Sequence, residues 1–194
     1  MVFECGTDGA DKAVCIHLAT MINPGIRIVP RTLDDKPNLI SDAGKTAEEL
    51  FELNCERVLI IWDLRPAWPN LNSKPCLVKE RNAILNTLTA ASLSCDAVDL
   101  ICILHELEAW LLSDERAIRD VLSTKAHPIT IRRRRNVDRL KNPKGILNSL
   151  FKRHRGRRYV DRYHAKEIAM AIPDLQRLRR IDSFRRFERA ILPT

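Results

Sequence analysis

Acidic side chains follow three of the predicted strands at the point where each strand ends. Glu4 closes the first predicted strand, and Asp63 closes a continuous apolar one. Glu106 and Glu108 come directly after the last predicted strand. In an open parallel sheet the carboxyl ends of the strands meet at one edge, and ligands bind there. The sequence therefore predicts that Glu4, Asp63 and a glutamate of the later pair converge at this edge.

A convergence of carboxylates has chemical consequences. Two like charges about 4 Å apart repel by about 4 kcal/mol at an effective dielectric constant of 20. Such a cluster is tolerated if one group stays protonated or if a divalent cation neutralises it. Because all the candidate ligands are oxygens, Mg²⁺ or Mn²⁺ would suit them better than zinc.

Ordinary structural roles remain open for the same side chains. Glu4 could simply end a strand, and Asp63 could cap the following turn. Glu106 and Glu108 could be acids in the first turn of a helix, where the helix dipole favours negative charge. These two glutamates are two residues apart and point in roughly opposite directions, so only one of them should face a site.

The charge of the chain is unevenly distributed. The net charge is +8, and the sequence pI is about 9.4. From Lys125 onward 21 Lys and Arg stand against 6 Asp and Glu, a net charge of +15, which leaves 12 basic and 19 acidic residues, a net charge of −7, for residues 1–124. Clustered arginines such as Arg132, Arg133, Arg134 and Arg135 are typical of phosphate and nucleic acid binding, although solvated loop charge is the alternative.

Composition excludes several classes of protein. Hydrophobic residues make up 45% and charged residues 30% of the 194 positions, which indicates one globular domain. No apolar run approaches the roughly 20 residues that span a bilayer, and the first residues do not resemble a signal segment, so a cytoplasmic protein without a membrane partner is expected. The six cysteines form no C-x-x-C pair, which argues against a zinc site, and Cys15, Cys95 and Cys102 are expected to be buried thiols.

Strands and helices alternate through the first 124 residues. Strands are predicted at residues 2–3, 26–29, 57–62 and 98–104, a loop at 36–41, and helices at 10–21, 46–54, 77–93 and from about 106. This alternation predicts an α/β fold with a central parallel sheet flanked by helices. Residues 125–194 change to basic loops and short helices, at 143–151, 165–171, 175–179 and 183–191, and are expected to form a basic helical C-terminal part packed on the same domain.

Several segments resemble the motifs of a known family. The run from Phe3 to Asp8 resembles the first Toprim motif, and the run from Val58 to Asp63 resembles the second. His105 to Leu112 resembles a Glu-Tyr-Glu-Ala-Trp-Phe-Leu block of a Toprim-like family known by the label domain of unknown function 4276. The C-terminal signature of that family is matched by residues 142–145, 163–171 and 182–187. The resemblance covers almost the whole chain in the right order.

The resemblance implies a Toprim-like, Rossmann-related core, as found in topoisomerases, primases and nucleases that accompany ATPases in phage defence. It implies that Glu4, Asp63 and Glu108 bind Mg²⁺ or Mn²⁺, with Glu106 as a supporting ligand. Glu4 could instead act as a general acid or base. Lys144 and Lys166 would neutralise charge on a phosphate, although Lys144 could equally be an ordinary lysine at a helix start.

One position departs from the family pattern. Asp63-Leu64-Arg65 carries an arginine where the family motif has a second acid. Arg65 could bind phosphate directly, the protein could use a single metal ion, or the site could be degenerate.

Two functions follow as expectations. The first is a metal-dependent nuclease that cleaves DNA or a structured RNA such as tRNA, as the effector of an ATPase-associated defence system. The second is a non-catalytic binding subunit whose basic half docks an ABC- or AAA-type ATPase partner or nucleic acid. Oligomerisation is open in both cases.

Overall fold

The computed structural model describes residues 1–70 and 72–192. Its centre is a four-stranded parallel sheet in the order β2-β1-β3-β4. The strands are β1 (Val2–Phe3), β2 (Arg31–Thr32), β3 (Val58–Asp63) and β4 (Val98–Ile103). The helices of the first part of the chain are α1 (Ala10–Ile22), α2 (Lys36–Glu52), α3 (Leu77–Ala90), α4 (Glu108–Leu112) and α5 (Glu115–Leu122), with a 3₁₀ turn η1 (Cys95–Ala97). This architecture confirms the predicted α/β class.

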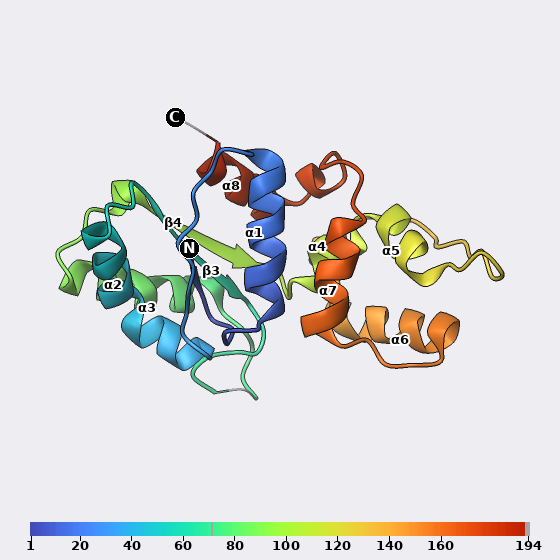
Figure 1. Ribbon diagram of the computed structural model, residues 1–194. Coiled ribbons are helices and arrows are strands. Elements are labelled where there is room, and N and C mark those ends of the chain that lie inside the picture. Colours follow the sequence, from blue (N-terminus) through green and yellow to red (C-terminus); the bar gives the residue numbers. More distant parts are fainter. Residues whose placement is uncertain (71, 193–194) are drawn as a thin grey trace.

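The second part of the chain is helical within the described residues. It contains α6 (Pro143–Arg155), α7 (Asp161–Met170) and α8 (Asp182–Ile191), with 3₁₀ turns η2 (Val137–Arg139) and η3 (Leu178–Arg180). In Figure 1, α8 lies beside the sheet, whereas α6 and α7 lie with α4 and α5 on the far side of α1. Helix α7 packs along α1, and α8 packs on β4.

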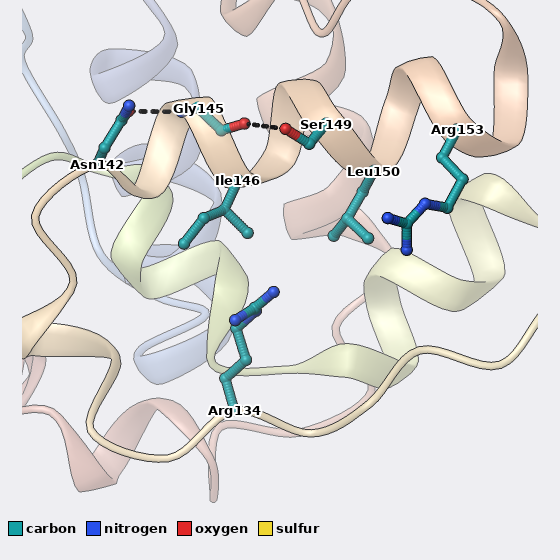
Figure 2. Close-up of a pocket in the computed structure, with 7 residues that line it drawn as sticks. All are labelled: Arg134, Asn142, Gly145, Ile146, Ser149, Leu150 and Arg153. Atoms are coloured by element: carbon teal, nitrogen blue, oxygen red, sulfur yellow. Dashed lines mark hydrogen bonds between the residues drawn. The ribbon is translucent and has the colours of Figure 1, made fainter.

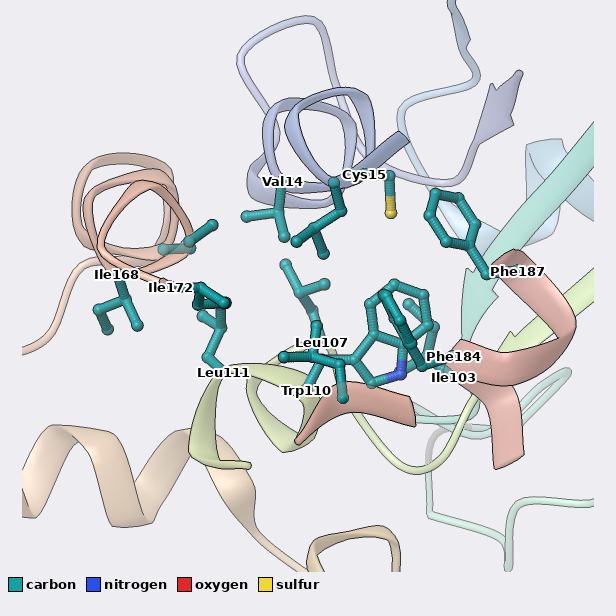
Figure 3. Packing of buried hydrophobic residues seen from close by; sticks show 14 of the residues in the cluster. Val14, Cys15, Ile103, Leu107, Trp110, Leu111, Ile168, Ile172, Phe184 and Phe187 are labelled. Atoms are coloured by element: carbon teal, nitrogen blue, oxygen red, sulfur yellow. The ribbon is translucent and has the colours of Figure 1, made fainter. Parts of the chain in front are cut away.

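Alternate side chains of the strands point to opposite faces of the sheet and contribute to two separate hydrophobic cores. On β3, Val58, Ile60 and Trp62 face α2 and α3, whereas Leu59 and Ile61 face the opposite side. This period of two is the signature of a strand buried on both faces. The core that contains Leu59 and Ile61 is the larger one, because α1, α4 and the C-terminal helices all contribute to it. Figure 3 shows side chains of these helices pointing into a common centre around Trp110.

The second strand lies further along the chain than the sequence predicted. Residues 26–29 have no strand partner, and β2 begins at Arg31 instead. The amide of Arg31 donates to the carbonyl of Met1 at 2.8 Å, and the amide of Leu33 donates to the carbonyl of Phe3 at 3.0 Å. The pairing with β1 therefore sets this strand, while the apolar side chains before it pack against the cores from an irregular segment.

Helix α2 begins at Lys36, so the predicted loop at residues 36–41 is wrong. The side chain of Asp35 caps the helix by accepting a hydrogen bond from the amide of Asn38 at 2.8 Å. Pro37 lies in the first turn, where its missing N–H costs nothing. A proline that suggests a loop in the sequence is here part of a helix start.

The burial of two cysteines agrees with the sequence prediction. Cys15 and Cys102 are buried free thiols, as predicted, and Cys5, Cys55 and Cys76 are also free. The side chain of Cys95 lies outside the described part of the structure. Among the described residues, no helix combines the length and the apolar character needed to cross a membrane.

Candidate metal and phosphate site

Three of the predicted carboxylates lie at the carboxyl edge of the sheet. Glu4 follows β1 directly, Asp63 is the last residue of β3, and Glu108 is the first residue of α4, which follows β4. Oδ2 of Asp63 accepts a hydrogen bond from the amide of Leu107 at 3.1 Å, which ties the end of β3 to the segment before α4. The side chain of Glu108 is buried in this segment.

Asp11 is a fourth member of the cluster, and the sequence analysis missed it. It lies in the first turn of α1, the helix that follows β1. Its charge raises the pKa of Asp63, Glu4 and Glu108. A signal was available, because the first turn of a helix after a parallel strand lies at the same edge as the strand end.

Burial and repulsion by nearby carboxylates raise the pKa of all four carboxyl groups, and for Asp11 the repelling carboxylate is Asp161. Burial is the largest cause at each of them. The pKa of Glu4 rises to about 8, that of Glu108 to about 7 and that of Asp11 to about 6. The pKa of Asp63 is raised well above its ordinary value, since burial is reinforced by the charges of the other three. Without a cation, the cluster therefore retains protons near neutral pH.

Two oxygens of the cluster lack a hydrogen-bond partner. Within the described residues, Oε2 of Glu4 and Oδ1 of Asp63 are both buried and accept no hydrogen bond. A buried acceptor left without a partner costs about 1–3 kcal/mol, so these atoms need a proton, a water molecule or a cation.

Lys144 provides the positive charge on one side of the cluster. It lies in the first turn of α6, where its amide donates to Oε2 of Glu106 at 3.2 Å and its ammonium group pairs with Asp161. Burial lowers the pKa of Lys144, but the hydrogen bond to Asp161 and the charges of Glu108 and Asp161 outweigh it and raise the pKa overall. Lys144 therefore stays charged beside the acidic cluster.

Tyr159 lies near Glu108 and Asp161, close enough for their charges to act on its hydroxyl group. Its hydroxyl group is buried and has no partner in hydrogen-bond geometry among the described residues. Burial and the charges of Glu108 and Asp161 raise the pKa of Tyr159, so the phenol stays neutral and can donate a proton to an oxygen. The sequence analysis did not identify this residue.

Lys36, the first residue of α2, binds the backbone at the end of β3. Its side chain is only 3% exposed, and its Nζ donates to the carbonyls of Asp63 and Pro66, each at 2.5 Å. Nζ also lies 3.4 Å from Oε2 of Glu80, which accepts from Nε1 of Trp62 at 3.0 Å. The charge of Lys36 lowers the pKa of Glu4 and so opposes the effect of burial. Lys36 is the third residue of the site, after Asp11 and Tyr159, that the sequence analysis missed.

The other predicted residues lie outside the carboxylate cluster. Arg65 is exposed after β3, and its amide donates to the carbonyl of His105 at 3.0 Å, so it lies near the same edge of the sheet. Glu106 contacts the start of α6 rather than the carboxylates. Arg132–Arg135 are exposed on the loop between α5 and η2, and Lys166 is exposed on α7, where its charge acts on His17.

The ligand atoms of the cluster are of the kind that a hard divalent cation prefers, but their present positions do not form a metal site. The cluster offers carboxylate oxygens, two of them without partners, which is the ligand chemistry of Mg²⁺ and Mn²⁺. Over residues 1–70 and 72–192, however, no three Asp, Glu, His or Cys side chains are close enough together to hold a metal ion as they stand. A cation would have to draw these side chains inward.

The fold and the site define an α/β protein with carboxylates at the carboxyl edge of its sheet, of which Glu108 is buried and the other three are partly buried. The chain belongs to the family described as "Domain of unknown function (DUF4276)", whose model matches residues 12–192. The match includes Asp63, Glu108 and Lys144, and it begins after Glu4 and Asp11. Comparison with curated proteins and with solved structures gives no match.

Proposed function

We propose that this protein is a divalent-metal-dependent nuclease of Toprim-like type that hydrolyses phosphodiester bonds in DNA or structured RNA. One observation carries the proposal: Glu4, Asp11, Asp63 and Glu108 are gathered at the carboxyl edge of a parallel sheet although the charges of the other three all raise the pKa of Asp63. A protein that only needed to fold would gain by replacing some of these acids with neutral residues. Binding of a divalent cation would offset this repulsion and would explain why the acids are kept together.

The residues divide into two groups by charge. Glu4, Asp63 and Glu108 would hold Mg²⁺ or Mn²⁺, and Asp11 would support them. Such an ion, when bound, activates a water molecule and neutralises charge on a phosphate. Lys144 lies beside Glu108 and would stabilise the charge that develops on the phosphate oxygens.

Exposed basic residues at the sheet edge and on the C-terminal half support a polyanionic substrate. Arg65 is exposed near the same edge, and Lys166 and Arg132–Arg135 are exposed on the C-terminal half, whose net charge is +15. Clustered arginines and lysines release counterions when they contact phosphates, which favours nucleic acid binding. A cytoplasmic location, an ATPase partner and a role in phage defence belong to this proposal through the family resemblance.

The test is metal-dependent cleavage of plasmid, single-stranded DNA and tRNA, with Mg²⁺ and with Mn²⁺. We expect Glu108→Gln to reduce cleavage by about 100-fold or more, because it removes a charged ligand while keeping the size of the side chain. Glu167→Gln is the matched control, since Glu167 is exposed on α7. It should cleave as the wild type does.

Two results would contradict the nuclease. Equal activity in Glu108→Gln and in the wild type would remove Glu108 from the chemistry. Absence of cleavage by a folded protein that also binds no Mn²⁺ in calorimetry would exclude the metal site itself.

A second candidate is a non-catalytic subunit that binds nucleic acid or an ATPase partner. Two observations favour it: Arg65 occupies the position of the expected second acid, and the described side chains do not come together as a set of three metal ligands. This candidate predicts nucleic acid binding that is unchanged in Glu108→Gln and independent of metal. Binding that requires Mn²⁺ would contradict it.

A further inference from the structure

A groove runs along α6 beside the arginine-rich loop. Its volume is about 450 Å³, which falls within the range of small-ligand sites. It is lined by Arg134, Asn142, Gly145, Ile146, Ser149, Leu150 and Arg153. Figure 2 shows Arg134 rising from the loop toward α6, while Ile146, Leu150 and Arg153 extend from α6 toward the same space. Loop and helix therefore form the two walls of one groove, and none of the four clustered carboxylates lines it.

The two arginines give the groove an uncompensated positive charge. Arg134 and Arg153 come from different walls, and both are exposed. No acidic residue lines the groove, and neither arginine forms a salt bridge with a described acidic side chain. Guanidinium groups in this state are suited to binding phosphate through paired hydrogen bonds.

Besides Arg153, the α6 wall carries two apolar side chains, which form what we call the floor of the groove. Ile146 and Leu150 are one helical turn apart on α6, and both are only partly buried. Polar groups lie at one end, where Oδ1 of Asn142 accepts from the amide of Gly145 at 2.8 Å and its NH₂ group is left as a donor. Apolar floor, arginine walls and an amide donor together match a nucleotide, which combines a flat base with a phosphate.

The groove adjoins the candidate metal site. Asn142 and Gly145 line it, and Lys144 lies between them in the sequence and pairs with Asp161 beside the acidic cluster. From Asn142 to Arg153 the helix extends roughly 16 Å at 1.5 Å per residue. A strand that lay in the groove would therefore lead toward the carboxyl edge of the sheet.

We propose that this groove binds an unpaired nucleotide of a single-stranded nucleic acid, with phosphates on Arg134 and Arg153 and the base on Ile146 and Leu150. This inference rests on the proposed function and extends it, because it names single strands as the substrate class. A duplex presents its sugar–phosphate backbone outward and keeps its bases stacked inside, so it has no apolar surface for the floor. An unpaired base does have one, and such bases are bound by contact with their faces.

The test measures binding separately from cleavage. Fluorescence anisotropy with oligothymidine, oligouridine and a blunt-ended two-stranded DNA duplex, in the presence of EDTA, reports affinity at salt concentrations from about 50 to 200 mM. We expect both single strands to bind more tightly than the duplex. The ratio between oligothymidine and oligouridine then identifies DNA or RNA as the preferred strand.

Variants separate the groove from general positive charge. Arg134→Ala and Arg153→Ala should each weaken binding of the single strand by about 5–10-fold and reduce the salt slope by about 0.7, the value for one lost phosphate contact on a single strand. Arg132→Ala is the matched control: it removes the same charge from the same loop, but Arg132 does not line the groove. Its effect should be less than about 2-fold if the groove carries the specificity.

The floor is tested by Leu150→Asn. We expect weaker binding by about 5-fold with an unchanged salt slope, because a base contact is lost and no phosphate contact is. Circular dichroism checks the fold of this variant, and the two arginine variants, which change exposed residues, test the groove independently of it.

Several outcomes would overturn the inference. Equal losses in Arg132→Ala, Arg134→Ala and Arg153→Ala would mean diffuse attraction without a groove. Tighter binding of the duplex than of both single strands, or no binding of either single strand at low salt, would also reject it. Specific binding in EDTA without cleavage in Mn²⁺ would leave the groove standing and remove the nuclease, so the two proposals fail separately.

Discussion

At the scale of single residues, the acidic cluster reverses the usual effect of carboxylates on stability. Most acidic side chains in folded proteins have a lowered pKa and stabilise the fold as the pH rises. Here burial and repulsion raise the pKa of Glu4 from its ordinary value of 4.5 to about 8. The folded protein therefore holds more protons than the unfolded chain between these two values.

The sign of the pH dependence follows from this difference. Because the folded state binds more protons, the free energy of unfolding contributed by Glu4 is fully present below about pH 4.5 and is lost as the pH rises toward about 8. We expect the Tm of the metal-free protein to fall across this window, and the fall to be smaller in Glu4→Gln, which cannot ionise. Each 1 kcal/mol that the variant recovers corresponds to about 2–4 °C for a chain of this size.

Thermal unfolding followed by circular dichroism from about pH 5 to about pH 9 measures both curves. Adding Mg²⁺ or Mn²⁺ above pH 7 should raise the Tm of the wild type more than that of Glu4→Gln, because a cation bound by the folded state stabilises it. Parallel curves for the two proteins, with and without metal, would show that Glu4 does not carry the effect.

At the scale of elements, α2 and α3 pack so closely that one position excludes any side chain. A Cβ atom added at Gly44 would lie 2.2 Å from the carbonyl oxygen of Thr87 on α3. The amide of Gly44 also donates to Oγ1 of Thr87 at 3.2 Å. These helices cover the face of the sheet behind the candidate site, and Lys36 at the start of α2 holds the end of β3.

Gly44→Ala should therefore destabilise the protein, although alanine is the better helix former. Overpacking of this kind costs about 1–3 kcal/mol, whereas the gain in helix propensity is about 1 kcal/mol at most. Urea unfolding measures the change. Gly25→Ala is the control, because its added Cβ would have its nearest neighbour at 3.7 Å, in ordinary contact. A Gly44→Ala protein as stable as the wild type would show that the helices separate freely.

At the scale of the whole molecule, the acidic and basic halves of the chain share one core. Trp110 is fully buried, and its Nε1 donates to Oγ of Ser183 at 2.9 Å. The ring centroids of Trp110 and Phe184 are 5.2 Å apart in an edge-on arrangement. Figure 3 shows both rings in the core. Arg177 adds an ion pair with the buried Asp114 at 3.3 Å. Residues from beyond position 124 thus complete the packing around the helix that carries Glu108.

A fragment of residues 1–124 should not fold on its own. It would expose Trp110 and the apolar side of the sheet to water, and the loss of two phenylalanines from a core costs about 3–5 kcal/mol for each. We expect binding of a hydrophobic dye, a weak near-ultraviolet dichroism signal and a red-shifted tryptophan emission. Cooperative unfolding of the fragment with native-like signals would contradict this expectation.

The sequence by itself determined the edge of the sheet at which the candidate site lies. Continuous apolar runs predicted the parallel strands, and the acids that follow them were located because carboxyl ends of parallel strands meet. Glu4, Asp63 and Glu108 were found in this way, and the structure gathers them within reach of one another's charge. Their metal chemistry and the roles of the basic residues are predictions that remain to be measured.

The tertiary structure alone decided what surrounds these three acids. Lys36 and Tyr159 join the site through contacts between segments far apart in the chain, and such contacts leave no local pattern in the sequence. The same reason explains β2, which is set by its pairing with β1. The start of α2 is different, because the cap by Asp35 and the proline in the first turn are local signals that the sequence analysis read as a loop. Local periodicity encodes which segments are strands and helices, whereas the partners of each side chain exist only after the chain has folded.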